Sequence, residues 1–165
     1  QGGNISSPVD TSHPSQSNYP NNVECVYYID VGQGYHVNLK FVDRFNIERP
    51  GASGRCNDYI IVEEKWGNST SDEEGDNDYR HISQRLCGSE NPPNITSTRD
   101  KIRITFRSNS NINAEGFKIS WERRCGETFY GGSGIIRSPN YPVKYDSNLD
   151  CEYRRFLNQM ENGDL

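Results

Sequence analysis

The sequence predicts an all-β protein: an antiparallel β-sandwich of the jelly-roll type, followed by an incomplete second copy of the same module. Three observations support this prediction. Apolar and polar residues alternate with a period of two over several short segments, as in half-buried strands. The composition favours turns, with 15 Gly and 8 Pro against 1 Met among 165 residues. A frame of residues around a cysteine also occurs twice, which indicates an internal repeat.

The repeated frame is clearest from Cys125 to Tyr153, where the chain reads CGETFYGGSGIIRSPNYPVKYDSNLDCEY. This stretch contains a Gly-rich run, the turn SPNYP and the closing pattern Y-x-x-N-x-x-C-x-Y. The same closing pattern runs from Tyr19 to Tyr27 as YPNNVECVY. We therefore expect two copies of one module, the first over residues 1–124 and the second, truncated, over residues 125–165.

Four segments of the first copy have the pattern of strands. The first runs from Tyr35 to Phe45. Its residues Val37, Leu39 and Phe41 fall on one face, and polar residues fall on the other. A mostly apolar run at 58–63 suits a central strand, and alternation returns at 101–107 and 116–121. The residues predicted to face inward there are Ile102, Ile104, Phe106, Phe117, Ile119 and Trp121. No window has a convincing helical period, so helices are expected to be single turns at most.

The stretch from Trp66 to Arg80 is polar and longer than a usual hairpin connection. It carries the acidic residues Asp72, Glu73, Glu74, Asp76 and Asp78. We expect a solvated, mobile insertion without a partner. The functional alternative is a contact for a basic patch on a ligand.

Composition and motifs exclude several classes of function. The formal net charge of -5 argues against a nucleic-acid surface. The sequence contains no run of about 18 apolar residues, which a membrane-spanning helix would need. No signal peptide is recognisable, so the chain is expected to be cut from a longer precursor or to begin after processing. The sequence contains neither H-E-x-x-H nor G-x-S-x-G nor a phosphate loop, so we expect no catalytic activity, although the chain could be an accessory part of an enzyme.

Cysteines and glycosylation motifs indicate secretion. Five cysteines in a polar, turn-rich chain indicate disulfides formed in an oxidising compartment, with one cysteine left over. Zinc coordination is set aside because no C-x-x-C pair occurs. Three sequons begin at Asn4, Asn68 and Asn94, each in a predicted turn or loop, where a glycan would reach solvent.

The repeated pattern, C-G-x(n)-G-x-I-x-S-P-N-Y-P-x-x-Y-x-x-N-x-x-C-x-Y, resembles the opening of a CUB domain, an extracellular β-sandwich module. The first copy continues in the same way through Cys56 and Cys87 to the ending GFKISW. The resemblance implies two disulfides, Cys56–Cys87 and Cys125–Cys151. It leaves Cys25 with a partner expected a few residues before Gln1, so that the N-terminal strand of the first module would be missing. The alternative is a reduced or intermolecular cysteine.

The resemblance also implies a calcium site, because many CUB domains bind Ca²⁺ at one end of the sandwich. The matching positions here are Glu48, Asp58, Asn109 and, less closely, Tyr19. Asp58 follows Cys56 after one residue instead of two, and Asn109 stands where a carboxylate is usual. Each lost charge weakens a calcium site. The alternative is that Glu48 and Asp58 are solvated loop acids and Asn109 forms a turn.

The function implied is that of a protein-binding module pair, secreted or in the extracellular part of a membrane protein. Tandem CUB receptors and co-receptors of the cubilin-like, neuropilin-like and tolloid-like kinds are the model for it, with an extracellular protein as ligand and no prediction of oligomeric state. Phe45 and Tyr59 are aromatic candidates for ligand contact, with core packing as their alternative. Two other functions stay open: the substrate-recruiting region of a secreted metallo- or serine protease, and a carbohydrate-binding role like that of spermadhesins.

Overall fold

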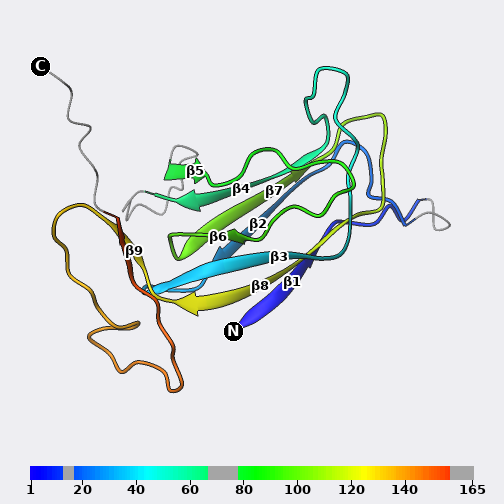
Figure 1. Ribbon diagram of the computed structural model, residues 1–165. Coiled ribbons are helices and arrows are strands. Elements are labelled where there is room, and N and C mark those ends of the chain that lie inside the picture. The colour runs from blue at the N-terminus through cyan, green and yellow to red at the C-terminus, as the bar shows by residue number, and fades with distance from the viewer. Residues whose placement is uncertain (13–16, 67–77, 157–165) are drawn as a thin grey trace, which may run out of the picture.

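The protein is a sandwich of two four-stranded antiparallel sheets (Figure 1). The computed structural model describes residues 1–12, 17–66 and 78–156. One sheet consists, in spatial order, of β1 (Gly2–Ser6), β8 (Gly116–Cys125), β3 (Tyr35–Asn46) and β6 (Ile95–Thr96). The other consists of β2 (Glu24–Asp30), β7 (Lys101–Arg107), β4 (Tyr59–Lys65) and β5 (Tyr79–His81). No helix occurs within these ranges. The predicted all-β antiparallel sandwich is confirmed.

The core lies between the two sheets and follows the alternation seen in the sequence. Val37, Leu39 and Phe41 on β3 are buried, at 0%, 1% and 8% exposure. The inward residues predicted for β7 and β8 are buried as well, except Trp121, which is half-buried. β4 lies between β7 and β5, so its prediction as a central strand is confirmed.

The sandwich differs from the sequence prediction in several elements, since β2 and β6 also lie outside the four predicted strands. β1 was not predicted, and it pairs with β8 along the edge of its sheet, so Asn4 lies in a strand instead of a loop. β8 continues to Cys125 because its last residues pair with the start of β3. β5 begins at Tyr79, inside the stretch expected to be a loop. The greater part of that stretch, residues 67–77, lies outside the described residues.

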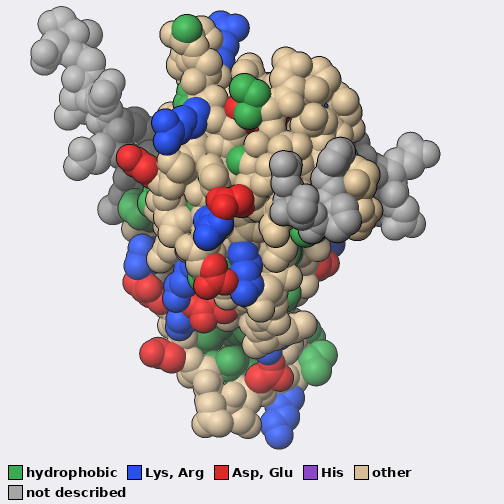
Figure 2. All heavy atoms as spheres, turned by 90° about the vertical axis from the view of Figure 1, so that its right-hand side faces the viewer, with side chains coloured by type: hydrophobic (Ala, Val, Ile, Leu, Met, Phe, Trp, Pro, Cys, Tyr) green, Lys and Arg blue, Asp and Glu red, His purple; other side chains and the backbone are tan. Residues whose placement is uncertain are grey.

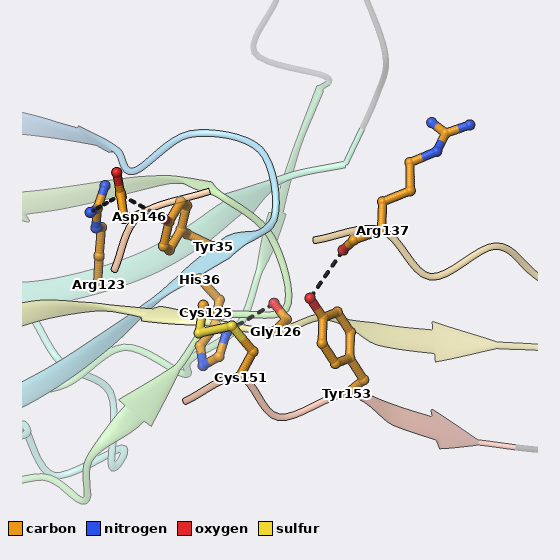
Figure 3. The surroundings of a disulfide bond; sticks show 9 residues. All are labelled: Tyr35, His36, Arg123, Cys125, Gly126, Arg137, Asp146, Cys151 and Tyr153. Atoms are coloured by element: carbon orange, nitrogen blue, oxygen red, sulfur yellow. Dashed lines mark hydrogen bonds and ion pairs between the residues drawn. A yellow bond between two sulfur atoms is a disulfide. The ribbon is translucent and has the colours of Figure 1, made fainter. Parts of the chain in front are cut away.

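The segment that follows β8 contacts the end of the sandwich at a few points, among them a disulfide (Figure 3). A disulfide joins Cys125, the last residue of β8, to Cys151. The Asp146 carboxylate accepts hydrogen bonds from the Tyr35 hydroxyl and from the Arg123 guanidinium, each at 2.9 Å. Pro139 is fully buried. The same segment contains a short parallel pair, β9 (Thr128–Tyr130) with β10 (Arg154–Phe156).

Candidate functional site

Four residues predicted as calcium ligands meet at the end of the sandwich where β4 begins. Tyr19 precedes β2, Glu48 follows β3, Asp58 directly precedes β4, and Asn109 follows β7. Antiparallel pairing of β2 and β4 with β7 brings the ends that carry Tyr19, Asp58 and Asn109 together. Residues up to 90 positions apart in sequence therefore form one cluster.

Asp58 is the centre of this cluster and is fully buried. Its Oδ2 accepts a hydrogen bond from the Tyr19 hydroxyl at 2.8 Å, and its Oδ1 accepts one from the Asn109 backbone N–H at 2.7 Å. The Tyr19 hydroxyl oxygen in turn accepts the Glu48 backbone N–H at 3.1 Å. Asp58 thus holds three loops in one arrangement.

Glu48 is the second carboxylate of the cluster and is 8% exposed. Its Oε1 accepts a hydrogen bond from Asn57 Nδ2 at 3.3 Å, and its Oε2 accepts one from Asn109 Nδ2 at 3.4 Å. Asn109 therefore turns its amide nitrogen towards Glu48, while its amide oxygen accepts the Asn111 backbone N–H at 2.8 Å. Asn57 was not predicted, although its position next to Asp58 is a signal that could have identified it.

Burial raises the pKa of the Asp58 carboxyl above its ordinary value. The hydrogen bonds from Asn109 and Tyr19 oppose this shift, and the charge of Glu48 adds to it. Burial also raises the pKa of the Tyr19 hydroxyl, which stays protonated and donates to Asp58. Within the described ranges, no Lys, Arg or His forms an ion pair with Glu48 or Asp58. Two buried carboxylates without a cation are costly unless they are neutralised.

A further polar group at this end lacks a partner. Asn21 Oδ1 is buried and accepts no hydrogen bond in the described part of the chain. The amide nitrogen of the same side chain donates to the backbone oxygens of Ser110 and Asn111, at 3.3 and 3.2 Å. An oxygen of this kind, with donors absent around it, suits coordination by a hard cation. Asn21 lies two residues after Tyr19, and its sequence position gave no signal of this.

The carboxylate and hydroxyl oxygens gathered here are of the kinds that calcium accepts. Ca²⁺ takes carboxylate, amide and hydroxyl oxygens in flexible geometry, and Glu48 and Asp58 supply the two charges. No group of three or more His, Cys, Asp and Glu side chains suited to a metal occurs in the residues that the structure describes. A calcium ion would therefore rely on two carboxylates supplemented by neutral oxygens. Charges of both signs are interspersed on this end of the molecule, without an extended hydrophobic patch (Figure 2).

The aromatic candidates are placed differently from each other. Phe45 is 3% exposed and packs edge-on against Phe41, with ring centroids 5.4 Å apart. It is a core residue, since a ring buried at this level offers no surface to a ligand. Tyr59 is half-buried, and the Arg85 guanidinium lies 4.1 Å from the centre of its ring.

The cysteines and sequons complete the predicted sites. The bridges Cys56–Cys87 and Cys125–Cys151 are both present, and Cys25 on β2 is a half-buried free cysteine. Asn4 and Asn94 are exposed. Asn68 lies outside the described residues.

Comparison with known proteins assigns the fold to a family. A family profile described as CUB domain matches residues 2–121. The chain belongs to the CUB domain family. The cysteine bridge Cys56–Cys87, the site cluster and the whole of the sandwich except the last four residues of β8 lie within the matched range.

Three relatives indicate where such CUB domains occur. The cubilin homolog of Caenorhabditis elegans is 33% identical over 153 residues, which cover 90% of this chain and 4% of that protein. Human tolloid-like protein 2 is 31% identical over 139 residues, covering 82% of this chain and 12% of that protein. The crystal structure of the MASP-1 CUB2 domain bound to Ca²⁺ matches with a TM-score of 0.52 and 29% identity, covering 73% of this chain and 90% of that one. The chain thus spans a small part of these cubilin and tolloid-like relatives.

In the described residues, no helix is long and apolar enough to cross a membrane.

Proposed function

We propose that this chain is an extracellular, non-catalytic protein-binding region of a tandem-CUB receptor or co-receptor, with a calcium-organised loop end as its binding surface. The observation that supports it is the pair of buried carboxylates, Glu48 and Asp58, held in one cluster without a basic partner in the described ranges. Calcium would neutralise this pair and fix the loops around it. Accessible groups at the same end, with the half-buried Tyr59 among them, would then contact a ligand that supplies Lys or Arg.

The segment from Cys125 onward is proposed to be the beginning of a second CUB module. It carries exposed side chains that a sandwich normally buries: Ile135, Ile136, Val143 and Tyr145, at 61% to 72% exposure. It is also anchored to the first sandwich by the Cys125–Cys151 bridge. Glycosylation at Asn94 and Asn4 is proposed as well, since both are exposed. The same modification is proposed at Asn68.

A second candidate function is the recruitment of substrates within a secreted protease. The similarity to human tolloid-like protein 2 supports this candidate. Both candidates use the same loop end, and they differ in the catalytic domain that the full protein would contain. The domain composition of the complete protein separates them.

The proposed function is tested by capturing ligands on the immobilised chain. Extracellular fluid of the source organism is passed over the native chain and over a Glu48→Gln, Asp58→Asn variant, in calcium and in chelator, and bound proteins are quantified by mass spectrometry. We expect a set of proteins with basic surfaces that is retained only by the native chain in calcium. Identical binding by both chains, or identical binding in chelator, would contradict the proposal.

Calcium affinity is expected to rise roughly tenfold in an Asn109→Asp variant, because a third carboxylate would face Glu48 and Asp58 where an amide nitrogen now stands. The native site is expected in the weak range of extracellular modules, about 10⁻⁴ to 10⁻³ M. Titration calorimetry measures both values. Asn111→Asp is the matched control, since it adds the same charge in the same loop but Asn111 does not contact Glu48. Equal gains in the two variants would show that the net charge of the loop, and not position 109, determines affinity.

The same calcium binding is expected to weaken in acid. The pKa of Asp58 is raised, so the carboxyl takes up a proton as the pH falls through that raised value, and the proton competes with the ion. Without calcium the sign is opposite: a raised folded-state pKa favours folding at low pH, and this contribution is lost as the pH rises through it. Calcium should therefore raise the melting temperature more at about pH 7.5 than at about pH 5. An equal shift at both values would contradict the role of Asp58.

A further inference from the structure

A tryptophan and two arginines form a second surface site at the opposite end of the sandwich, which we call the indole–arginine patch. Trp66 directly follows β4, Arg80 belongs to β5, and Arg99 lies in the turn before β7. The Arg80 and Arg99 guanidinium carbons lie 4.3 and 4.7 Å from the centre of the Trp66 ring. Trp66 is 36% exposed and Arg80 is exposed. Both guanidinium groups contact the same accessible indole. The two guanidinium carbons therefore lie no farther from each other than the sum of these two distances.

The surrounding backbone fixes each member of the patch. Arg80 is the cross-strand neighbour of Glu64 in the β4–β5 ladder. The backbone N–H of Trp66 donates to the backbone carbonyl oxygen of Asp78 at 2.8 Å. The turn that carries Arg99 is anchored on the same glutamate: Glu64 accepts the Thr98 N–H and the Thr98 hydroxyl, each at 2.7 Å. The patch is therefore built on β4 and is pre-organised, which lowers the entropy that a ligand must overcome on binding.

Six of the described arginines are paired with a carboxylate, whereas Arg80 and Arg99 belong to those that are not. Arg103, Arg123 and Arg124, for example, each form an ion pair with a carboxylate. Arg80 and Arg99 form none within the described ranges, and both oxygens of nearby Glu64 are taken by Thr98. A guanidinium stacked on an indole keeps its edge N–H groups available, and these match a carboxylate in bidentate geometry. The patch has the charge and the donors of an anion site, with no anion in the described protein to fill it.

We propose that the indole–arginine patch binds the carboxylates of an acidic segment on a protein ligand. The net charge of -5 opposes a long polyanion, which interacts with the field of the whole molecule, and favours a short segment bound through local contacts. In an extended segment, side chains on the same face repeat about every 7 Å. Two such carboxylates can therefore reach Arg80 and Arg99 at once.

This site is separate from the calcium site in place and in charge. β4 begins beside Asp58 and ends beside Trp66, and its seven residues span about 23 Å at 3.3 Å each. The acidic end attracts cations and basic ligand groups, whereas the patch attracts carboxylates. The inference does not depend on the proposed role of calcium, because none of the patch residues belongs to the Tyr19, Glu48, Asp58 and Asn109 cluster. Binding to the patch is accordingly expected to be unchanged in chelator.

The test uses the two tryptophans of the chain as reporter and internal reference. The ¹⁵N-labelled chain is titrated, in chelator, with a capped Asp-Ser-Asp-Ser-Asp-Ser peptide while the indole N–H signals are followed by NMR. Trp121 lies on β8 in the other sheet and is the reference. We expect a saturable shift of the Trp66 signal and of the Arg80 and Arg99 Nε–H signals, weakened by added salt. A Trp66 shift no larger than that of Trp121, or an equal response to the Asn-Ser counterpart, would overturn the proposal.

Charge-neutral variants locate the site. Arg80→Gln and Arg99→Gln are each expected to weaken peptide binding about tenfold, while Arg55→Gln, which removes the same charge from an exposed loop, leaves it unchanged. Unchanged affinity in the Arg80→Gln, Arg99→Gln double variant would overturn the assignment. A sulfated heparin hexasaccharide is titrated in parallel. If it shifts the same signals at lower concentration than the peptide, the site serves sulfated glycans and the assignment to protein carboxylates is overturned.

Discussion

Removing the Cys56–Cys87 bridge is expected to lower the free energy of unfolding by about 2–5 kcal/mol. The bridge spans a sequence separation of 31 residues, and its loss restores that conformational freedom to the unfolded chain. The bridge also fixes two loops of the site. Cys56 lies two residues before Asp58. Cys87 is followed by Gly88, which pairs with Ile47 next to Glu48. Denaturant unfolding of a Cys56→Ala, Cys87→Ala variant measures the loss, and calcium calorimetry on the same protein should show weaker binding.

The control for this experiment is Cys25→Ala, which removes a half-buried thiol but no bridge. Its cost is expected to be about 1 kcal/mol, typical of a small truncation. Equal losses for the two variants would mean that the packing of cysteine side chains, and not the covalent link, accounts for the effect. In both variants the Cys125–Cys151 bridge stays intact.

The sequence predicted the central strands because their signal is local. Side chains on a strand alternate between faces, so the burial of Val37, Leu39 and Phe41 follows from their spacing alone. The pairing of β4 with β7 joins segments about 40 residues apart, and spacing does not specify it. The position of Asp58 beside Asn109 was anticipated through the resemblance to CUB domains, together with the tendency of loops after alternate strands to meet at one end of a sandwich.

Other features could not be predicted because tertiary contacts determine them. β1 begins with two glycines and has no apolar alternation over most of its length, and it becomes a strand because the edge of β8 offers hydrogen-bonding groups. The indole–arginine patch gathers residues 14 and 19 positions apart that share no motif. Phe45 is a further example. The sequence does not distinguish an aromatic residue that packs in the core from one that faces a ligand, and Phe45 is buried.

Gly126→Ala is expected to release the segment after β8 from the sandwich. Gly126 has φ of +119°, and an added Cβ would lie 1.8 Å from the backbone oxygen of Glu152. The substitution therefore has two costs. The positive φ strains the backbone of any residue other than glycine, and the clash is with backbone atoms, so no side-chain rotation relieves it. We expect the free energy with which this segment docks to fall by more than about 2 kcal/mol. The contacts of Asp146 with Tyr35 and Arg123 should then break first. Hydrogen exchange should then accelerate at Glu152 and Arg154, whose N–H groups bond to Cys125 and Glu127, while β3 and β7 keep their protection.

Gly131→Ala separates the strain from the clash. Gly131 has φ of +111°, close to that of Gly126, but an added Cβ would meet no atom within 4 Å. It should therefore show only the backbone penalty, about 1–2 kcal/mol, with the segment still docked. If Gly126→Ala and Gly131→Ala accelerate exchange at Glu152 equally, the close approach of the Gly126 and Glu152 backbones does not keep the segment after β8 docked. If only Gly126→Ala does so, the Gly126–Glu152 contact fixes the orientation of the segment that follows β8.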